Sequence, residues 1–102
     1  MSQFDVHRNL GRAAKEVPFL VVMQHDYYAG LPTLIVAPAL LLPPERALSR
    51  VMPRVTVGTE QLFLSMPEIF AIEPSRLGPV IGSVAEFRLE IVAALDRLIT
   101  GV

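Results

Sequence analysis

The sequence lacks cysteine and tryptophan altogether, and it contains few charged residues. Without cysteine the chain can form no disulfide, thiolate nucleophile or thiolate metal site, a composition compatible with a reducing cytoplasm. Charged residues occupy only 19% of the 102 positions, and the formal net charge is −1. General nucleic-acid-binding proteins are usually strongly basic, so this charge balance argues against that class.

Long hydrophobic runs are also missing. The longest one, residues 34–42, is interrupted by Pro38 and is too short to cross a bilayer. The first residues lack the basic start and apolar stretch of a signal peptide. We therefore expect a cytoplasmic protein that does not interact with a membrane.

Hydrophobic residues, by contrast, are abundant, at 52% of the sequence. A chain of this length is expected to form one domain, residues 1–102. Such a small domain buries only about two-thirds of the surface that its unfolded chain exposes. Either the core is very dense or part of the apolar surface is covered by a second copy of the chain, and of the two we predict a homodimer.

Short apolar runs separated by turn residues predict a mainly β fold. Strands are expected at residues 4–7, 18–23, 33–36 and 69–72, with Pro38 ending the third, and residues 8–16 are expected to form a loop. Residues 54–57 and 60–64 predict a hairpin in which Gly58 and Thr59 form a type II′ turn. Residues 43–46 favour a short helical turn, and residues 77–79 another turn.

One helix is expected at the C-terminal end of the sequence. Ser83 and Glu86 have the spacing of a capping box, and an amphipathic pattern continues to Ile99. The residues expected to face the core are Phe87, Ile91, Leu95 and Leu98, with Val92 and Ile99 at the flank. Many strands followed by one helix predict a curved antiparallel sheet packed against a C-terminal helix.

Two features of this helix do not fit a simple division into core and solvent faces. Arg88 projects near the middle of the apolar stripe, where its guanidinium must either be paired or reach the edge of the core. It is expected to be a structural ion pair, a snorkelling side chain or a charge that organises a binding site. Leu89, Ala93, Asp96 and Thr100 share one side of the helix. That side is either a protein contact continued by the last two residues or a tolerant solvent face, and the spacing favours neither.

The sequence contains no recognisable catalytic motif. Its only histidines, His7 and His25, lie on separate predicted segments, and no spacing supports a metal site. No serine lies in a nucleophile motif, and no phosphate-binding loop is present. We therefore expect no cofactor and no enzymatic activity.

Several exposed residue types are candidates for binding a partner instead. Basic residues gather as Arg8, Arg12 and Lys15 in the first loop and as Arg46, Arg50 and Arg54 further on. They either receive an acidic peptide or nucleic acid or are ordinary solvated charges. Tyr27 and Tyr28 follow a predicted strand, where adjacent side chains point in opposite directions, so one is expected to be buried and the other exposed as an anchor.

Motifs along nearly the whole chain together resemble a known family. They are Gln3-Phe4 with Val6, Phe19-Leu-Val-Val-Met-Gln24 with Asp26, Leu34-Ile-Val-Ala-Pro38, Pro53-Arg-Val-Thr-Val-Gly58, residues 77–81, and the helix with Arg88, Ile91, Ala94-Leu95-Asp96 and Gly101-Val102. In order and spacing these features resemble the CcdB family of toxins from type II toxin–antitoxin systems.

The resemblance implies an SH3-like barrel of antiparallel sheet, as in CcdB and MazF-like proteins, that forms a homodimer. Family members act without catalysis: they bind the A subunit of DNA gyrase, poison the gyrase–DNA cleavage complex and block replication. A CcdA-like antitoxin neutralises the toxin through a tail that folds onto it. Operator DNA is bound only together with the antitoxin, in a repressor complex of a plasmid-maintenance module.

The same resemblance assigns candidate site residues by position. The gyrase contact would use Tyr27, Tyr28, Asp96, Ile99, Thr100, Gly101 and Val102. The antitoxin contact would use Arg8, Arg12, Lys15, Arg46 and Arg50. No catalytic residue and no metal ligand is implied.

Two other functions remain open at this point. One is a non-toxic or differently targeted CcdB-like binding protein, because Thr100 stands where the best-known members carry a tryptophan. The other is a MazF-like endoribonuclease on a related barrel. That activity would need an acid–base constellation, and we cannot assemble one from these residues.

Overall fold

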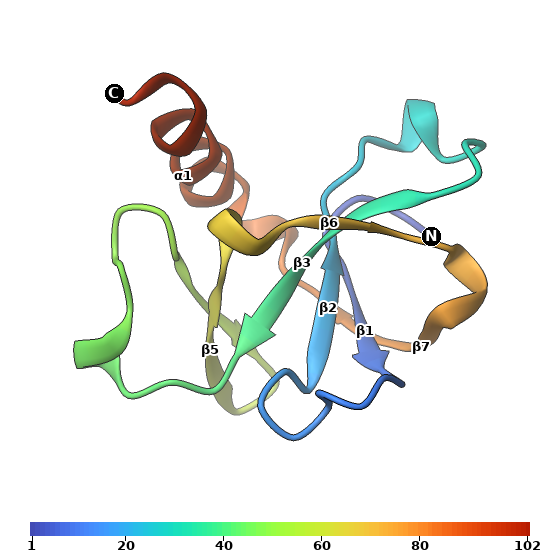
Figure 1. Cartoon of the computed structure of the whole chain (residues 1–102), viewed down its shortest axis with the longest axis horizontal. Coiled ribbons are helices and arrows are strands. Elements are labelled where there is room, and N and C mark those ends of the chain that lie inside the picture. Colours follow the sequence, from blue (N-terminus) through green and yellow to red (C-terminus); the bar gives the residue numbers. More distant parts are fainter.

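The computed structural model describes residues 1–102 as a curled antiparallel sheet with one helix (Figure 1). The strands are β1 (Asp5–Asn9), β2 (Phe19–Val22), β3 (Leu34–Leu40), β4 (Arg54–Val57), β5 (Glu60–Leu64), β6 (Phe70–Ile72) and β7 (Leu77–Ser83). The helix is α1 (Arg88–Thr100). Five 3₁₀ turns connect them: η1 (Asp26–Tyr28), η2 (Pro44–Arg46), η3 (Met66–Glu68), η4 (Pro74–Arg76) and η5 (Ala85–Phe87). The expected class, mainly β with a C-terminal helix in a barrel-like sheet, is confirmed.

The sheet divides at β3. Its strand order is β4-β5-β3-β2-β1-β7, and β6 pairs with β3 off this path. One edge of β3 therefore serves two partners: Ala39 and Leu40 pair with β5, whereas Leu34, Ile35 and Val36 pair with β6. β6 pairs with β3 but does not pair with β4 or β5. In Figure 1 it crosses in front of β2 and β3, and the sheet as a whole curls into a half-barrel.

The curl produces two apolar cores, one on each face of β2 and β3. The larger core contains Phe19 and Val21 of β2, together with residues of β4, β5 and α1. The smaller core contains Leu20 and Val22 of β2, with Leu34 and Val36 of β3 and Leu77 of β7. All four residues of β2 are buried, because the strand has a core on either face.

Pro38 does not end β3, contrary to expectation. The neighbouring residues Ala37 and Ala39 pair with β2, and the carbonyl of Pro38 accepts a hydrogen bond from the backbone N–H of Ser65 at 3.0 Å. Backbone groups alternate in direction along a strand, so the nitrogen of Pro38 points away from β2. A proline is tolerated there because the pairing with β2 loses no donor.

Two other segments also differ from the expectation. Residues 77–79 continue as strand β7 rather than forming a turn, and Arg8 and Asn9 belong to β1 rather than to the following loop. The reason is that β1 and β7 pair with each other, as in the pair Asn9 and Leu77, across a long sequence separation. The hairpin of β4 and β5 is confirmed, and Gly58 has a φ of 63°, as a type II′ turn requires.

The helix begins later than expected, and the capping box does not form. Ser83 is still part of β7, where it pairs with Asp5, and its Oγ accepts a hydrogen bond from the N–H of Ala85 at 3.1 Å. The chain then passes through η5 before α1 starts at Arg88. With 13 residues, α1 is too short to span a membrane, and the structure contains no longer helix.

The buried face of α1 also differs from the predicted stripe. Ile91 and Ala94 are the buried residues of the helix, whereas Leu98 is 38% exposed and Ile99 is 73% exposed. The first half of α1 packs against η3 over the larger core, and the second half extends beyond it (Figure 1). The hydrophobic periodicity of the sequence predicts the helix correctly. It does not show which turns of the helix lie over the core, so it wrongly extends the buried face to Leu98.

Candidate protein-binding surfaces

The last turn of α1 and the residues after it form an exposed surface of mixed polarity, which we call the terminal surface: Asp96, Ile99, Thr100, Gly101 and Val102. Gly101 closes the helix with a φ of 81°, and its N–H donates to the carbonyl of Arg97 at 2.9 Å. The hydroxyl of Thr100 donates to the carbonyl of Asp96 at 2.7 Å, so it is held against the helix. The apolar side chains of Ile99 and Val102 are 73% and 84% exposed.

Tyr27 and Tyr28 form a second exposed surface on η1. Their rings pack edge to face with centroids 5.0 Å apart, and the side chains are 81% and 54% exposed. Neither is buried, contrary to expectation, because the backbone forms a 3₁₀ turn here rather than an extended strand. His25 Nδ1 accepts a hydrogen bond from the N–H of Tyr27 at 3.0 Å, and the Gln24 side chain donates to the carbonyl of Tyr28 at 2.7 Å. These bonds fix the turn that presents both rings.

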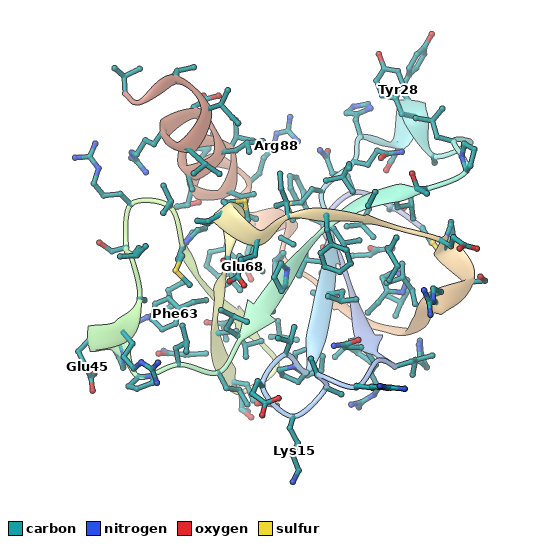
Figure 2. The ribbon with its side chains drawn as sticks, in the orientation of Figure 1. Lys15, Tyr28, Glu45, Phe63, Glu68 and Arg88 are labelled. Atoms are coloured by element: carbon teal, nitrogen blue, oxygen red, sulfur yellow. The ribbon has the colours of Figure 1, made fainter.

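The tyrosine pair and the terminal surface do not meet within one chain. Figure 1 shows η1 and the C-terminal end of α1 on opposite sides of the molecule, and Figure 2 shows Tyr28 pointing outward on its own side. A partner that contacts both must therefore span the molecule, or a second copy of the chain must supply one of them.

The candidate basic residues lie on two separate loops. Arg8 is on β1, Arg12 and Lys15 are in the loop between β1 and β2, and all three are exposed. Arg46 and Arg50 are exposed in and after η2. Figure 2 shows Lys15 at the bottom of the view and Glu45 of η2 at its left edge, so the loops occupy different corners. The structure therefore does not gather the five residues into one cluster.

Of the alternatives that the sequence left for Arg88, the structure shows a side chain that reaches the edge of the core and forms no ion pair. Its side chain is exposed, its Nη1 donates to the side-chain oxygen of Gln3 at 3.2 Å, and its guanidinium lies 5.7 Å from the centroid of the Phe4 ring. The contact is a cation–π interaction beside the core rather than an ion pair within it. The prediction placed Arg88 within a helix that begins near Ser83, whereas α1 begins only at Arg88. The side chain of Arg88 therefore does not lie on the buried face of the helix.

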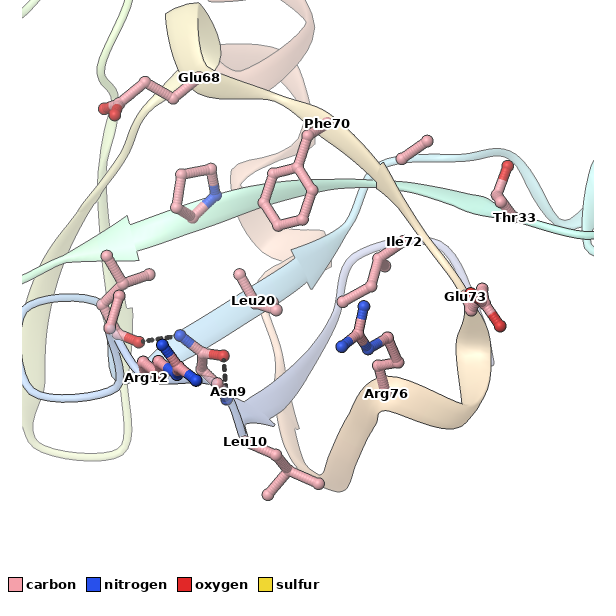
Figure 3. Close-up of a pocket in the computed structure, with 15 residues that line it drawn as sticks. Asn9, Leu10, Arg12, Leu20, Thr33, Glu68, Phe70, Ile72, Glu73 and Arg76 are labelled. Atoms are coloured by element: carbon pink, nitrogen blue, oxygen red, sulfur yellow. Dashed lines mark hydrogen bonds between the residues drawn. The ribbon is translucent and has the colours of Figure 1, made fainter.

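A groove that the sequence analysis missed lies between β6, η4 and the loop after β1 (Figure 3). Its volume is about 810 Å³. Its lining includes Arg12, Leu20, Pro38, Phe70, Ile72 and Arg76. Of these residues, only Arg12 was a candidate from the sequence. The groove forms only when β6 lies against β3, and no local sequence pattern predicts that arrangement.

His7 is the one buried histidine, and its contacts belong to the packing of the strands rather than to a reactive site. It is 2% exposed, and its Nδ1 lies 2.9 Å from the carbonyl of Gly78, to which it must donate. Its Nε2 has no hydrogen-bond partner. An imidazole enclosed in this way has no access to a substrate. Nowhere do three or more histidine, aspartate or glutamate side chains gather in a metal-binding arrangement.

Comparison with known protein families identifies a family for nearly the whole chain. The model of the family described as CcdB protein matches residues 3–101 of the chain. No curated protein matches the chain. The matched region includes every strand, the helix and all candidate residues named above except Val102.

Proposed function

Because the chain belongs to the CcdB family, whose members are toxins of toxin–antitoxin systems that act on DNA gyrase, we propose that it binds the gyrase A subunit and poisons the gyrase–DNA cleavage complex. The family match over residues 3–101 is the observation that carries this proposal. Replication is then blocked by double-strand breaks that gyrase itself makes. The toxin contributes binding energy and no chemical step.

The exposed residues of the terminal surface support a binding role. Ile99 and Val102 present apolar side chains to solvent, and burial of one such side chain contributes roughly 1.5–3 kcal/mol. The αL conformation of Gly101 turns the chain away from the helix axis and so sets the direction of Val102. Asp96 and Thr100 supply polar groups beside these side chains. The tyrosine pair, on the opposite side of the molecule, offers a second contact of the aromatic type that is enriched in binding hot spots.

The remaining partners belong to the same proposal. A CcdA-like antitoxin contacts Arg8, Arg12, Lys15, Arg46 and Arg50, since exposed guanidinium and ammonium groups pair with acidic side chains. The toxin acts as a homodimer in the cytoplasm and needs no cofactor. With a net charge of −1 it binds operator DNA only in complex with the antitoxin.

Calorimetry with a gyrase A fragment tests the proposal. The matched variants are Ile99→Ala and Leu89→Ala, which truncate two exposed side chains of the same helix, 73% and 81% exposed. Ile99→Ala should weaken binding by about tenfold, the effect of losing roughly 1.4 kcal/mol of contact. Leu89→Ala should leave the affinity unchanged, and deletion of Gly101 and Val102 should abolish binding without unfolding the protein.

The functional counterpart of this measurement is gyrase-dependent cleavage of supercoiled plasmid. The wild-type protein should raise the amount of linear DNA, and the deletion variant should not. If the folded wild-type protein neither binds the fragment nor increases cleavage, the toxin proposal is wrong, and a non-toxic CcdB-like binding protein is the remaining interpretation.

A further inference from the structure

The groove beside β6 combines an apolar floor with two unpaired cations. Leu20 lies at its floor, and Phe70, which is 42% exposed, and Ile72 lie along one side (Figure 3). Pro38 also lines the groove. Arg12 reaches it from the loop after β1, and Arg76 reaches it from η4. In the structure the only guanidinium groups with hydrogen bonds to other residues are those of Arg88 and Arg97, so Arg12 and Arg76 are free to bind.

The groove is also lined by two carboxylates, those of Glu68 and Glu73, and neither forms an ion pair with Arg12 or Arg76. Glu68 is held by Ser65, whose hydroxyl donates to Glu68 Oε1 at 2.7 Å. Figure 3 shows the Glu68 carboxylate pointing away from the groove, whereas Glu73 lies in the turn that carries Arg76, and its carbonyl accepts a hydrogen bond from the backbone N–H of Arg76 at 2.9 Å. Because neither carboxylate pairs with them, both guanidinium groups remain available to an anionic group of a ligand.

One edge of β6 is open along this groove. The carbonyl of Ile35 accepts a hydrogen bond from Met23 on the β2 side, so the backbone groups of Leu34 and Val36 face β6. These two residues pair with Ile72 and Phe70, which leaves the N–H and C=O of Ala71 pointing outward. No strand pairs with β6 other than β3, and Ala71 lines the groove.

The wall opposite β6 is already ordered. The side-chain nitrogen of Asn9 donates to the carbonyl of Val17 at 2.8 Å, and its side-chain oxygen accepts from the N–H of Gly11 at 2.9 Å. A third bond joins the N–H of Val17 to the carbonyl of Ala13 at 2.8 Å. Because these bonds fix the loop that carries Arg12, a ligand need not order it on binding.

We propose that this groove binds an extended acidic segment of a partner protein, which hydrogen-bonds to the open edge at Ala71 and places carboxylates on Arg12 and Arg76. The segment's apolar side chains lie over Leu20, Phe70 and Ile72, in the manner of strand addition to a sheet edge. The inference rests on the proposed function in one respect, because the antitoxin is the partner expected to carry such a segment. It does not involve the terminal surface.

Fluorescence anisotropy with labelled synthetic peptides tests this inference. In one peptide valine alternates with glutamate, and in its counterpart valine alternates with lysine. The glutamate peptide should bind the wild-type protein, and the lysine peptide should not. Arg76→Glu should weaken binding by about tenfold or more, because it removes a charged hydrogen bond and adds a repulsion. Arg88→Glu, a charge reversal at an exposed arginine outside the groove, should leave binding unchanged.

A second measurement needs no variant. In NMR spectra of the wild-type protein, the glutamate peptide should shift the backbone amide signals of Leu20, Ala71 and Ile72. Shifts confined to another surface, equal affinity of the Arg76→Glu variant, or no binding to the folded protein would each overturn the inference.

The outcome is separable from that of the proposed function. Arg76→Glu should bind the gyrase A fragment as the wild type does, because Arg76 lies outside the terminal surface. If gyrase binding and neutralisation by an antitoxin persist while the acidic peptide fails to bind, the groove inference fails and the proposed function stands.

Discussion

Gly78 lies where β7 passes closest to β1. A Cβ atom at this position would lie 2.8 Å from the carbonyl oxygen of Arg8 and 3.0 Å from its Cβ atom. The same glycine provides the carbonyl to which His7 Nδ1 donates. The missing side chain therefore allows the approach of two strands and the only hydrogen bond of a buried imidazole.

Replacing Gly78 by alanine should lower the free energy of unfolding by about 1–3 kcal/mol, because the new methyl group meets backbone atoms that cannot move independently. Urea denaturation measures this change. Gly30→Ala is the matched control: nothing lies within 4 Å of the Cβ position there, so its stability should not fall. Equal urea midpoints for the two variants would contradict the steric explanation.

At the scale of elements, α1 is attached mainly through its first half. Ile91 is 2% exposed and Ala94 is 1% exposed, and neither Leu98 nor Ile99 is buried. The side chains of this helix therefore separate into a packing set near η3 and a presenting set near Gly101. Stability should depend on the first set and partner binding on the second.

Truncation of two helix side chains tests this division. Ile91→Ala should destabilise the protein by about 2–5 kcal/mol, because it leaves a cavity in the larger core. Leu89→Ala should change stability by less than about 0.5 kcal/mol, because Leu89 is 81% exposed. Thermal denaturation followed by circular dichroism distinguishes them, and similar losses in both variants would show that the helix packs on a different face.

How far the elements could be predicted depends on the range of the interactions that form them. The β4–β5 hairpin was predicted correctly because its turn chemistry is local. The path of β3 through Pro38 and the strand at residues 77–79 were not, since both depend on partners far away in sequence. For the candidate sites, the helical pattern placed Ile99 at the flank of the core face, and only the family resemblance assigned it to a contact, although it is 73% exposed. The η1 turn under the tyrosines and the groove beside β6 required the tertiary fold.

The whole molecule leaves many large apolar side chains exposed. They include Leu31, Phe70, Val80, Leu89, Ile99 and Val102, each at least 42% exposed. Single exposed apolar residues are common on protein surfaces, but this number on a domain of 102 residues is consistent with the homodimer we propose.

If the folded state is a homodimer, its melting temperature depends on protein concentration, because unfolding then also dissociates the subunits. A tenfold increase in concentration should raise the melting temperature by roughly 3 °C for a dimer of this size. Sedimentation equilibrium gives the molecular mass on the same samples. A melting temperature independent of concentration, together with a monomer mass, would exclude the dimer.

The burial of β2 on both faces has a consequence for the chain before it folds. A strand without a solvent face must be apolar at every position, and Phe19–Val22 therefore forms an uncharged run rich in β-branched residues. Such runs are prone to aggregate while they are exposed during synthesis. Lys15, Glu16 and Pro18 precede the run and Asp26 follows it. We expect these flanking residues to act as gatekeepers, which keep the nascent chain soluble until both cores have closed over β2.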